Sequence, residues 1–88
     1  MDIAIVFGSV LRTLRKKAGL TQEQLGFEAG LERNYISMLE LGQRHPSLAT
    51  VFKLAPPLEV SPSQIIAIVE ATNPDVQSEK QISRSSKE

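Results

Sequence analysis

The chain has 88 residues and no cysteine, and its 10 basic and 10 acidic residues give a formal net charge of zero. This length fits one small domain, and the lack of cysteine excludes a disulfide framework and a thiolate metal site. No apolar run approaches the roughly 20 residues that a membrane-spanning helix needs, and the apolar N-terminus lacks the basic segment and cleavage site of a signal peptide. We therefore expect a soluble, cytoplasmic protein with no membrane partner.

The charges are distributed unevenly along the chain. Residues 10–54 contain seven Lys or Arg and four Glu, whereas most of the other acidic residues follow Pro57. A basic patch on one surface indicates nucleic-acid binding better than the total charge does. A solvated, charged helix face explains the same distribution equally well.

Two helices are predicted before residue 30. Apolar residues recur at three- and four-residue spacing over residues 2–18, and Gly19 follows as a stop signal. Thr21 is a suitable N-cap, and Gln24 three residues later completes a capping box for a second helix. Gly30 ends that helix in a tight turn.

A third helix is predicted over residues 32–41 and ends at Gly42. At 100° per residue, Ile36 and Leu39 point to one side of this helix. The opposite arc carries Arg33, Asn34, Ser37, Met38 and Leu41.

The second half of the chain predicts two more helices and a tail. Ser47 caps a fourth helix, which Pro56-Pro57 should end because proline has no N–H to donate. Its expected inner face consists of Leu48, Val51, Phe52 and Ala55. A fifth helix begins at Ser61 with a capping box and runs to about residue 71. We expect an all-α, five-helix domain over residues 1–71 and a polar, disordered tail over residues 72–88.

Residues 21–42 have the layout of a helix-turn-helix. Two short helices are joined by a glycine turn, and polar residues project from the start of the second one. Such a helix fits the major groove of DNA, which is roughly 12 Å wide. Helices this short need the other three as a platform, because they are unstable alone in water.

Over roughly residues 10–69 the sequence resembles the phage-repressor (Cro/CI-type, XRE-like) helix-turn-helix family. The resemblance rests on three stretches in family order: RKKAGLTQEQL from Arg15, AGLERNYISMLELG from Ala29, and RHPSLATVFKLA from Arg44. The segment LERNYIS is also similar to controller proteins of restriction–modification systems. Two features depart from the family: Pro56-Pro57 within the fourth helix, and Leu41 at a usually polar or basic position.

The resemblance implies a set of DNA contacts. Gln22 would hold a phosphate, Arg33, Asn34, Ser37 and Met38 would face bases, and Tyr35 and Arg44 would lie beside them. Arg suits guanine, Asn suits adenine, and Met38 suits a thymine methyl group. Packing at the helix edge is the alternative for Tyr35, and extending the helix cap is the alternative for Gln22. The resemblance also implies an ion pair between Arg15 and Glu40.

A run of five apolar residues in the fifth helix covers its whole circumference, so one side needs a partner. We expect a homodimer that reads a palindromic operator with two helices one DNA turn apart. The expected interface residues are Leu58, Val60, Ile65, Ile66, Ile68 and Val69.

The main hypothesis is therefore a homodimeric transcriptional regulator, of the repressor or controller kind, with double-stranded DNA as its partner. The alternative is an antitoxin or adaptor whose helical domain mainly binds a protein. An enzyme is not expected, because the sequence has one histidine, no phosphate-binding glycine loop and no paired carboxylates beside a base. No cofactor, catalytic residue or metal ligand is assigned.

Overall fold

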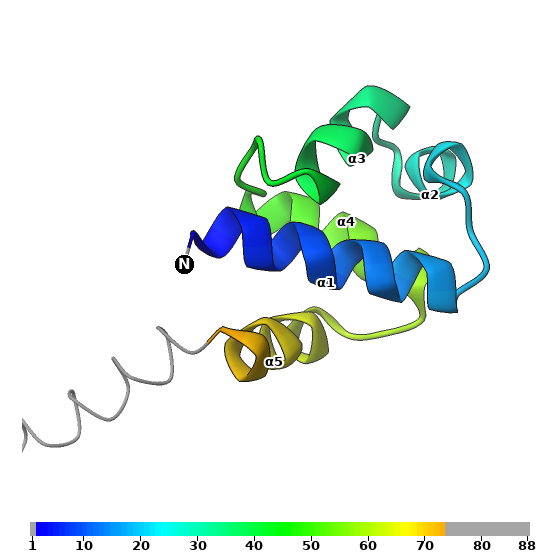
Figure 1. Ribbon diagram of the computed structural model, residues 1–88. Helices are drawn as coiled ribbons and strands as arrows, with labels where there is room; N and C mark the ends of the chain where they lie inside the picture. Colours follow the sequence, from blue (N-terminus) through cyan, green and yellow to red (C-terminus); the bar gives the residue numbers. More distant parts are fainter. Residues whose placement is uncertain (1, 74–88) are drawn as a thin grey trace, which may run out of the picture.

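The computed structural model describes residues 2–73, which contain five α-helices and no strand. These helices are α1 (Ile3–Lys17), α2 (Gln22–Ala29), α3 (Arg33–Glu40), α4 (Leu48–Leu58) and α5 (Pro62–Thr72). Figure 1 shows α2 and α3 on one side of α1 and α5 on the other. Contacts join α4 to both α2 and α5. The expectation of an all-α, five-helix domain is confirmed.

No helix within residues 2–73 combines the length and the apolar character needed to cross a membrane.

Local hydrogen bonds define the helix starts, as the sequence predicts. The Thr21 hydroxyl accepts from the Gln24 N–H at 3.0 Å, and the Gln24 side chain accepts from the Thr21 N–H at 2.9 Å. The same reciprocal pair joins Ser61 and Gln64 at the start of α5. Both predicted capping boxes are therefore confirmed.

A close approach of α1 and α3 lies at the centre of the fold. Ile36 and Leu39 of α3 are fully buried, as predicted, and Leu11 of α1 is 1% exposed. A Cβ atom at Gly8 would collide with the carbonyl oxygens of Leu39 and Glu40. Only glycine at this position lets the two helices pack at the observed separation.

The prediction that Pro56-Pro57 ends the fourth helix is wrong. The helix contains both prolines and continues to Leu58, which is 4% exposed. The prolines leave the carbonyl groups of Phe52 and Lys53 without helical donors. Both of those residues are exposed, so water can take the place of the missing N–H groups. The longer helix brings Leu58 into the core, and its burial is stabilising.

The expected inner face of α4 is only half right. Val51 and Ala55 are buried, but Leu48 is 71% exposed and Phe52 is 58% exposed. The buried stripe is instead centred near Leu54, which has no exposed surface. Leu48 and Phe52 therefore lie beyond the edge of the stripe that packs on the core.

The folded domain extends slightly further than residue 71. Thr72 completes α5, and Asn73 caps it and is 2% exposed, so both belong to the domain. The remainder of the predicted tail, residues 74–88, lies outside the described residues.

A buried ion pair joins α1 to α3. The Arg15 Nε and Nη2 atoms donate to the two carboxylate oxygens of Glu40 at 2.6 and 3.0 Å, and Nη1 donates to the Leu20 carbonyl at 2.9 Å. The two side chains are only 10% and 4% exposed. The hydrogen bond to Glu40 raises the pKa of Arg15 above its ordinary value, and Coulombic attraction adds to this against the opposing effect of burial. The predicted pair is confirmed.

Removing one partner of this pair should unfold the domain more easily. We expect Arg15→Ala to lower the free energy of unfolding by about 3–5 kcal/mol, because the Glu40 carboxylate is left buried without its cation. Urea unfolding followed by circular dichroism measures this change.

Arg12→Ala is the matched control, since Arg12 is an exposed arginine of the same helix. It should change the free energy of unfolding by less than about 0.5 kcal/mol. Equal effects of the two substitutions would show that the ion pair does not hold α1 and α3 together.

Candidate nucleic-acid interface

The helix-turn-helix is formed by α2 and α3 and the turn between them. Gly30 ends α2 in the left-handed region with φ 71°. Gly26 allows close packing behind the turn, because a Cβ there would lie 2.6 Å from the Leu31 carbonyl oxygen. With Ile36 and Leu39 buried beneath it, α3 presents its opposite face outward.

Four predicted base-facing residues share that outward face. Arg33 and Asn34 are exposed in the first turn of α3, and Ser37 and Met38 are half-buried one turn later. Residues three and four apart lie on the same side of a helix. The structure therefore brings the four side chains into one strip, and their contact with bases stays a prediction.

Tyr35 packs at the edge of α3 and holds Arg44 beside it. The Tyr35 hydroxyl lies 3.4 Å from the Thr50 Oγ1 atom. The Arg44 guanidinium carbon lies 5.6 Å from the centre of the Tyr35 ring, within the range of a cation–π interaction. Arg44 is itself exposed, so this contact orients an otherwise mobile side chain beside the strip.

Thr50 is a positioning residue that the sequence analysis missed. It is 7% exposed, and its N–H donates to the Ser47 hydroxyl at 3.1 Å. The Ser47 hydroxyl in turn donates to the Thr50 hydroxyl at 3.0 Å. The sequence contained a signal that could have identified Thr50: two hydroxyl residues lie three positions apart at a helix start. Such residues face each other across the first turn.

Gln22 is hydrogen bonded within the protein. Its Nε2 atom donates to the Glu40 carboxylate at 3.1 Å, so the amide shares its acceptor with Arg15. The amide nitrogen carries a second hydrogen that can reach another acceptor. Gln22 is the first residue of α2, where the helix dipole favours an anion.

The predicted dimer interface stays a prediction, and its six residues differ in their exposure. Leu58, Ile65 and Val69 are 4%, 1% and 7% exposed and belong to the core of the protomer itself. Val60 is half-buried against that core. The buried members of the set pack within the protomer, and their contact with a second chain stays a prediction. The exposed members of the predicted set are Ile66 at 50% and Ile68 at 38%.

In the part of the chain covered by the structure, no group of three or more His, Cys, Asp or Glu side chains could hold a metal ion.

Comparison with known proteins identifies the family. A helix-turn-helix family model matches residues 11–65. The chain is 38% identical over 66 residues to the control protein C.BamHI of Bacillus amyloliquefaciens, covering 74% of this chain and 82% of that protein.

Two solved structures agree with this finding. The restriction–modification controller protein C.AhdI from Aeromonas hydrophila has a TM-score of 0.68 and 44% identity, over 70% of this chain and 94% of that one. The controller protein C.Esp1396I, solved as a tetramer with its natural 35-base-pair operator, has a TM-score of 0.74 and 25% identity, over 82% and 95% of the two chains. The predicted resemblance is thus confirmed, and the chain belongs to the helix-turn-helix family.

Proposed function

We propose that this protein is a homodimeric transcriptional regulator of the restriction–modification controller type, which binds a palindromic operator through α3. One observation carries the proposal: the strip of Arg33, Asn34, Ser37 and Met38 stands outward on a short helix whose other side is buried. A helix that presents polar side chains from its first turns can enter the major groove and reach base edges. This function requires neither catalysis nor a cofactor, and it places the protein in the cytoplasm with the DNA.

Base reading is assigned to the first turn of α3. Arg33 has a planar guanidinium that can donate two hydrogen bonds to guanine, and the Asn34 amide can bond adenine in the same bidentate way. Ser37 and Met38 lie one turn later on the strip. The Ser37 hydroxyl can hydrogen bond to a base edge, and the Met38 side chain can make an apolar contact with a thymine methyl group. Both exposed side chains of the first turn are available without any change in the core.

Backbone contacts are assigned to the flanks of the strip. Gln22 offers its second amide hydrogen to a phosphate at the N-terminus of α2. On the other flank, Arg44 rests on the Tyr35 ring and brings a positive charge to the groove edge. Phosphate contacts position a protein on the duplex and carry no sequence information directly.

A two-fold dimer recognises a longer DNA site than a single chain does, because it carries two α3 helices. One α3 helix spans a few base pairs, and a dimer places two such helices one DNA turn apart. The similar controller protein C.Esp1396I is a tetramer on its natural operator. We infer that a dimer of this chain is the unit that binds one palindrome.

Substitution of a base-reading residue and of a phosphate-binding residue should change DNA binding in different ways. Arg33→Ala should cost about 1–3 kcal/mol of operator affinity and relax base preference at one position in each half-site. Gln22→Ala should weaken binding to all sequences about equally. Fluorescence anisotropy with a selected operator and its single-base variants measures both patterns.

Arg33→Lys is the control that separates charge from geometry, because lysine keeps the charge but loses the planar fork. It should relax base preference nearly as much as alanine does. A uniform loss of affinity with base preference intact would contradict the assignment of Arg33 as a reading residue.

A protein-binding adaptor is the second candidate, and one side chain favours it. Phe27 on α2 is 87% exposed, the most of any large apolar side chain among the described residues, and a protein partner would bury it. The salt dependence of binding distinguishes the two functions. Operator affinity should fall steeply and linearly in a log–log plot over roughly 50–200 mM salt, because bound phosphates release counterions.

The same titration on Phe27→Ser is the control. This variant should retain the operator affinity and the salt slope of the wild-type protein, since Phe27 lies outside the proposed DNA contacts. Operator binding that is absent at low salt would leave the adaptor as the better explanation.

A further inference from the structure

The end of α3 carries an exposed apolar side chain that the DNA contacts proposed above do not use. Leu41 is 63% exposed and is the C-cap residue of the helix. Its backbone keeps helical dihedral angles, with φ -83° and ψ -3°, and its N–H donates to the Ser37 carbonyl at 3.0 Å. The direction of the Leu41 side chain therefore follows from the helical repeat of α3.

This direction places Leu41 within the strip of Arg33, Asn34, Ser37 and Met38. Leu41 follows Ser37 by four residues and Met38 by three, so the three residues share one side of α3. At 100° per residue, Leu41 lies about 80° around the helix axis from Arg33, inside the arc of about 140° between Arg33 and Met38. A DNA groove that receives the whole strip therefore receives Leu41 as well.

Backbone contacts hold the end of α3 in place. Gly42, which follows Leu41, has φ 75°, and the Gln43 N–H donates to the Met38 carbonyl at 2.9 Å. A Cβ atom at Gly42 would lie 2.8 Å from the Ile5 Cγ1 atom, so α1 lies directly against this turn. Leu41 thus projects from a helix end whose backbone is fixed before DNA binds.

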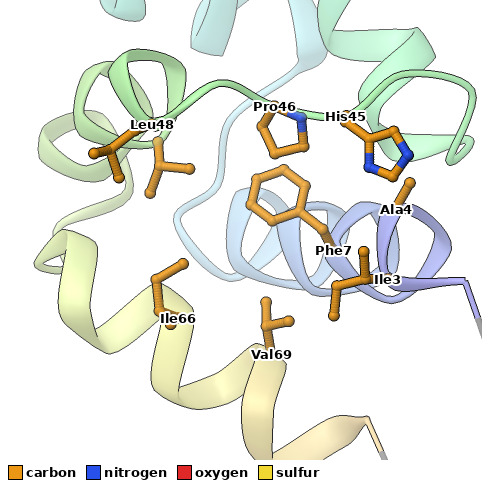
Figure 2. Close-up of a pocket in the computed structure, with 9 residues that line it drawn as sticks. Ile3, Ala4, Phe7, His45, Pro46, Leu48, Ile66 and Val69 are labelled. Atoms are coloured by element: carbon orange, nitrogen blue, oxygen red, sulfur yellow. The ribbon is translucent and has the colours of Figure 1, made fainter. Parts of the chain in front are cut away.

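Other exposed apolar side chains belong to different surfaces. Figure 2 shows Leu48 and Ile66 around an apolar groove beside the Phe7 ring. The residues that line this groove do not include Leu41. Phe27 projects from α2, outside the strip. An occupant of those surfaces does not account for Leu41, whereas a ligand of the strip buries it.

We propose that Leu41 reads the 5-methyl group of a thymine at the far end of the strip. The proposal rests on the proposed function and adds a base that α3 distinguishes. The strip changes character along the helix, from the polar Arg33 and Asn34 in the first turn to Met38 and Leu41 at the end. The thymine methyl group is the apolar feature that base edges present in the major groove. An apolar side chain gains affinity there by removing the methyl group from water.

Helix geometry gives the position of this thymine. Arg33 and Leu41 are separated by about 12 Å along the helix axis, at 1.5 Å per residue. Neighbouring base pairs are about 3.4 Å apart. For a helix that lies along the groove, the thymine read by Leu41 is therefore about three to four base pairs from the base read by Arg33.

Replacing thymine by uracil tests the methyl group alone, because uracil keeps every hydrogen-bonding atom of the base edge. The selected operator is altered at one thymine position at a time, in both half-sites, and binding is measured by fluorescence anisotropy. At one position the affinity of the wild type should fall about fourfold for each half-site, as expected for one buried methyl group. Leu41→Ala should reduce this ratio to below about twofold, because alanine is too short to cover the methyl group.

Two variants are the controls for this measurement. Leu41→Met keeps a large apolar side chain and should retain most of the preference for thymine over uracil. Phe27→Ala removes an exposed apolar side chain outside the strip and should leave the preference unchanged. Leu41→Ala should keep the circular dichroism spectrum and the urea midpoint of the wild type, since Leu41 is exposed.

Cytosine methylation gives a second readout at the same position. Replacing the thymine by cytosine changes the hydrogen-bonding groups of the base, and 5-methylcytosine restores only the methyl group. The wild type should bind the 5-methylcytosine operator about fourfold more tightly for each half-site than the cytosine operator. Leu41→Ala should bind the two operators about equally.

The outcomes separate this inference from the proposed function. Sequence-specific binding that is equal for thymine and uracil at every position would overturn the inference and leave the proposed function in place. A preference for thymine that Leu41→Ala retains in full would do the same, as would a methyl-sensitive position directly beside the base at which Arg33→Ala relaxes preference. Absence of operator binding at low salt would contradict the proposed function itself, and the inference with it.

Discussion

The buried carboxylate of Glu40 is the group on which the orientation of the helix-turn-helix depends. It accepts hydrogen bonds from Arg15 of α1 and from Gln22 of α2 while belonging to α3. A buried charge is costly unless all its partners are in place, so departures from this arrangement are penalised strongly. An apolar replacement of similar size is often as stable as a buried ion pair, so we infer that this pair specifies geometry more than it adds net stability. Three helices are thus set relative to one another at a single point.

This arrangement explains how helices of eight residues serve as a rigid reading unit. Neither α2 nor α3 is long enough to be stable alone. The buried Ile36 and Leu39 attach α3 to the core. Gly8 lets α1 approach closely, so that α1 packs against the last turn of α3. Because Gln22 bonds to the same carboxylate, the start of α2 is held against the end of α3. The amide proposed to meet a phosphate is therefore oriented before DNA arrives, which lowers the entropy lost on binding.

The features that sequence predicts well are those determined within one or two turns. Thr21 and Ser61 define helix starts through bonds to residues three positions away, and the spacing of Ile36 and Leu39 defines the inner face of α3. The Arg15–Glu40 pair joins residues 25 apart, so the family resemblance implied it and local spacing did not. The errors lie in α4, where apolar residues cover more than one face. Periodicity cannot decide which side packs inward there, since the choice depends on neighbouring helices.

The segment between α3 and α4 belongs to two surfaces at once. Arg44 leans on Tyr35 beside the strip that we propose reads bases, and the next residues, His45 and Pro46, line an apolar groove together with Phe7. Thr50 anchors the far end of the segment through its bonds to Ser47 and its proximity to the Tyr35 hydroxyl. A shift of this wall moves the backbone that carries Arg44, because only one residue separates Arg44 from Pro46, whose φ is restricted. The proposed DNA contact of Arg44 is therefore linked to the wall of the groove by a short stretch of backbone.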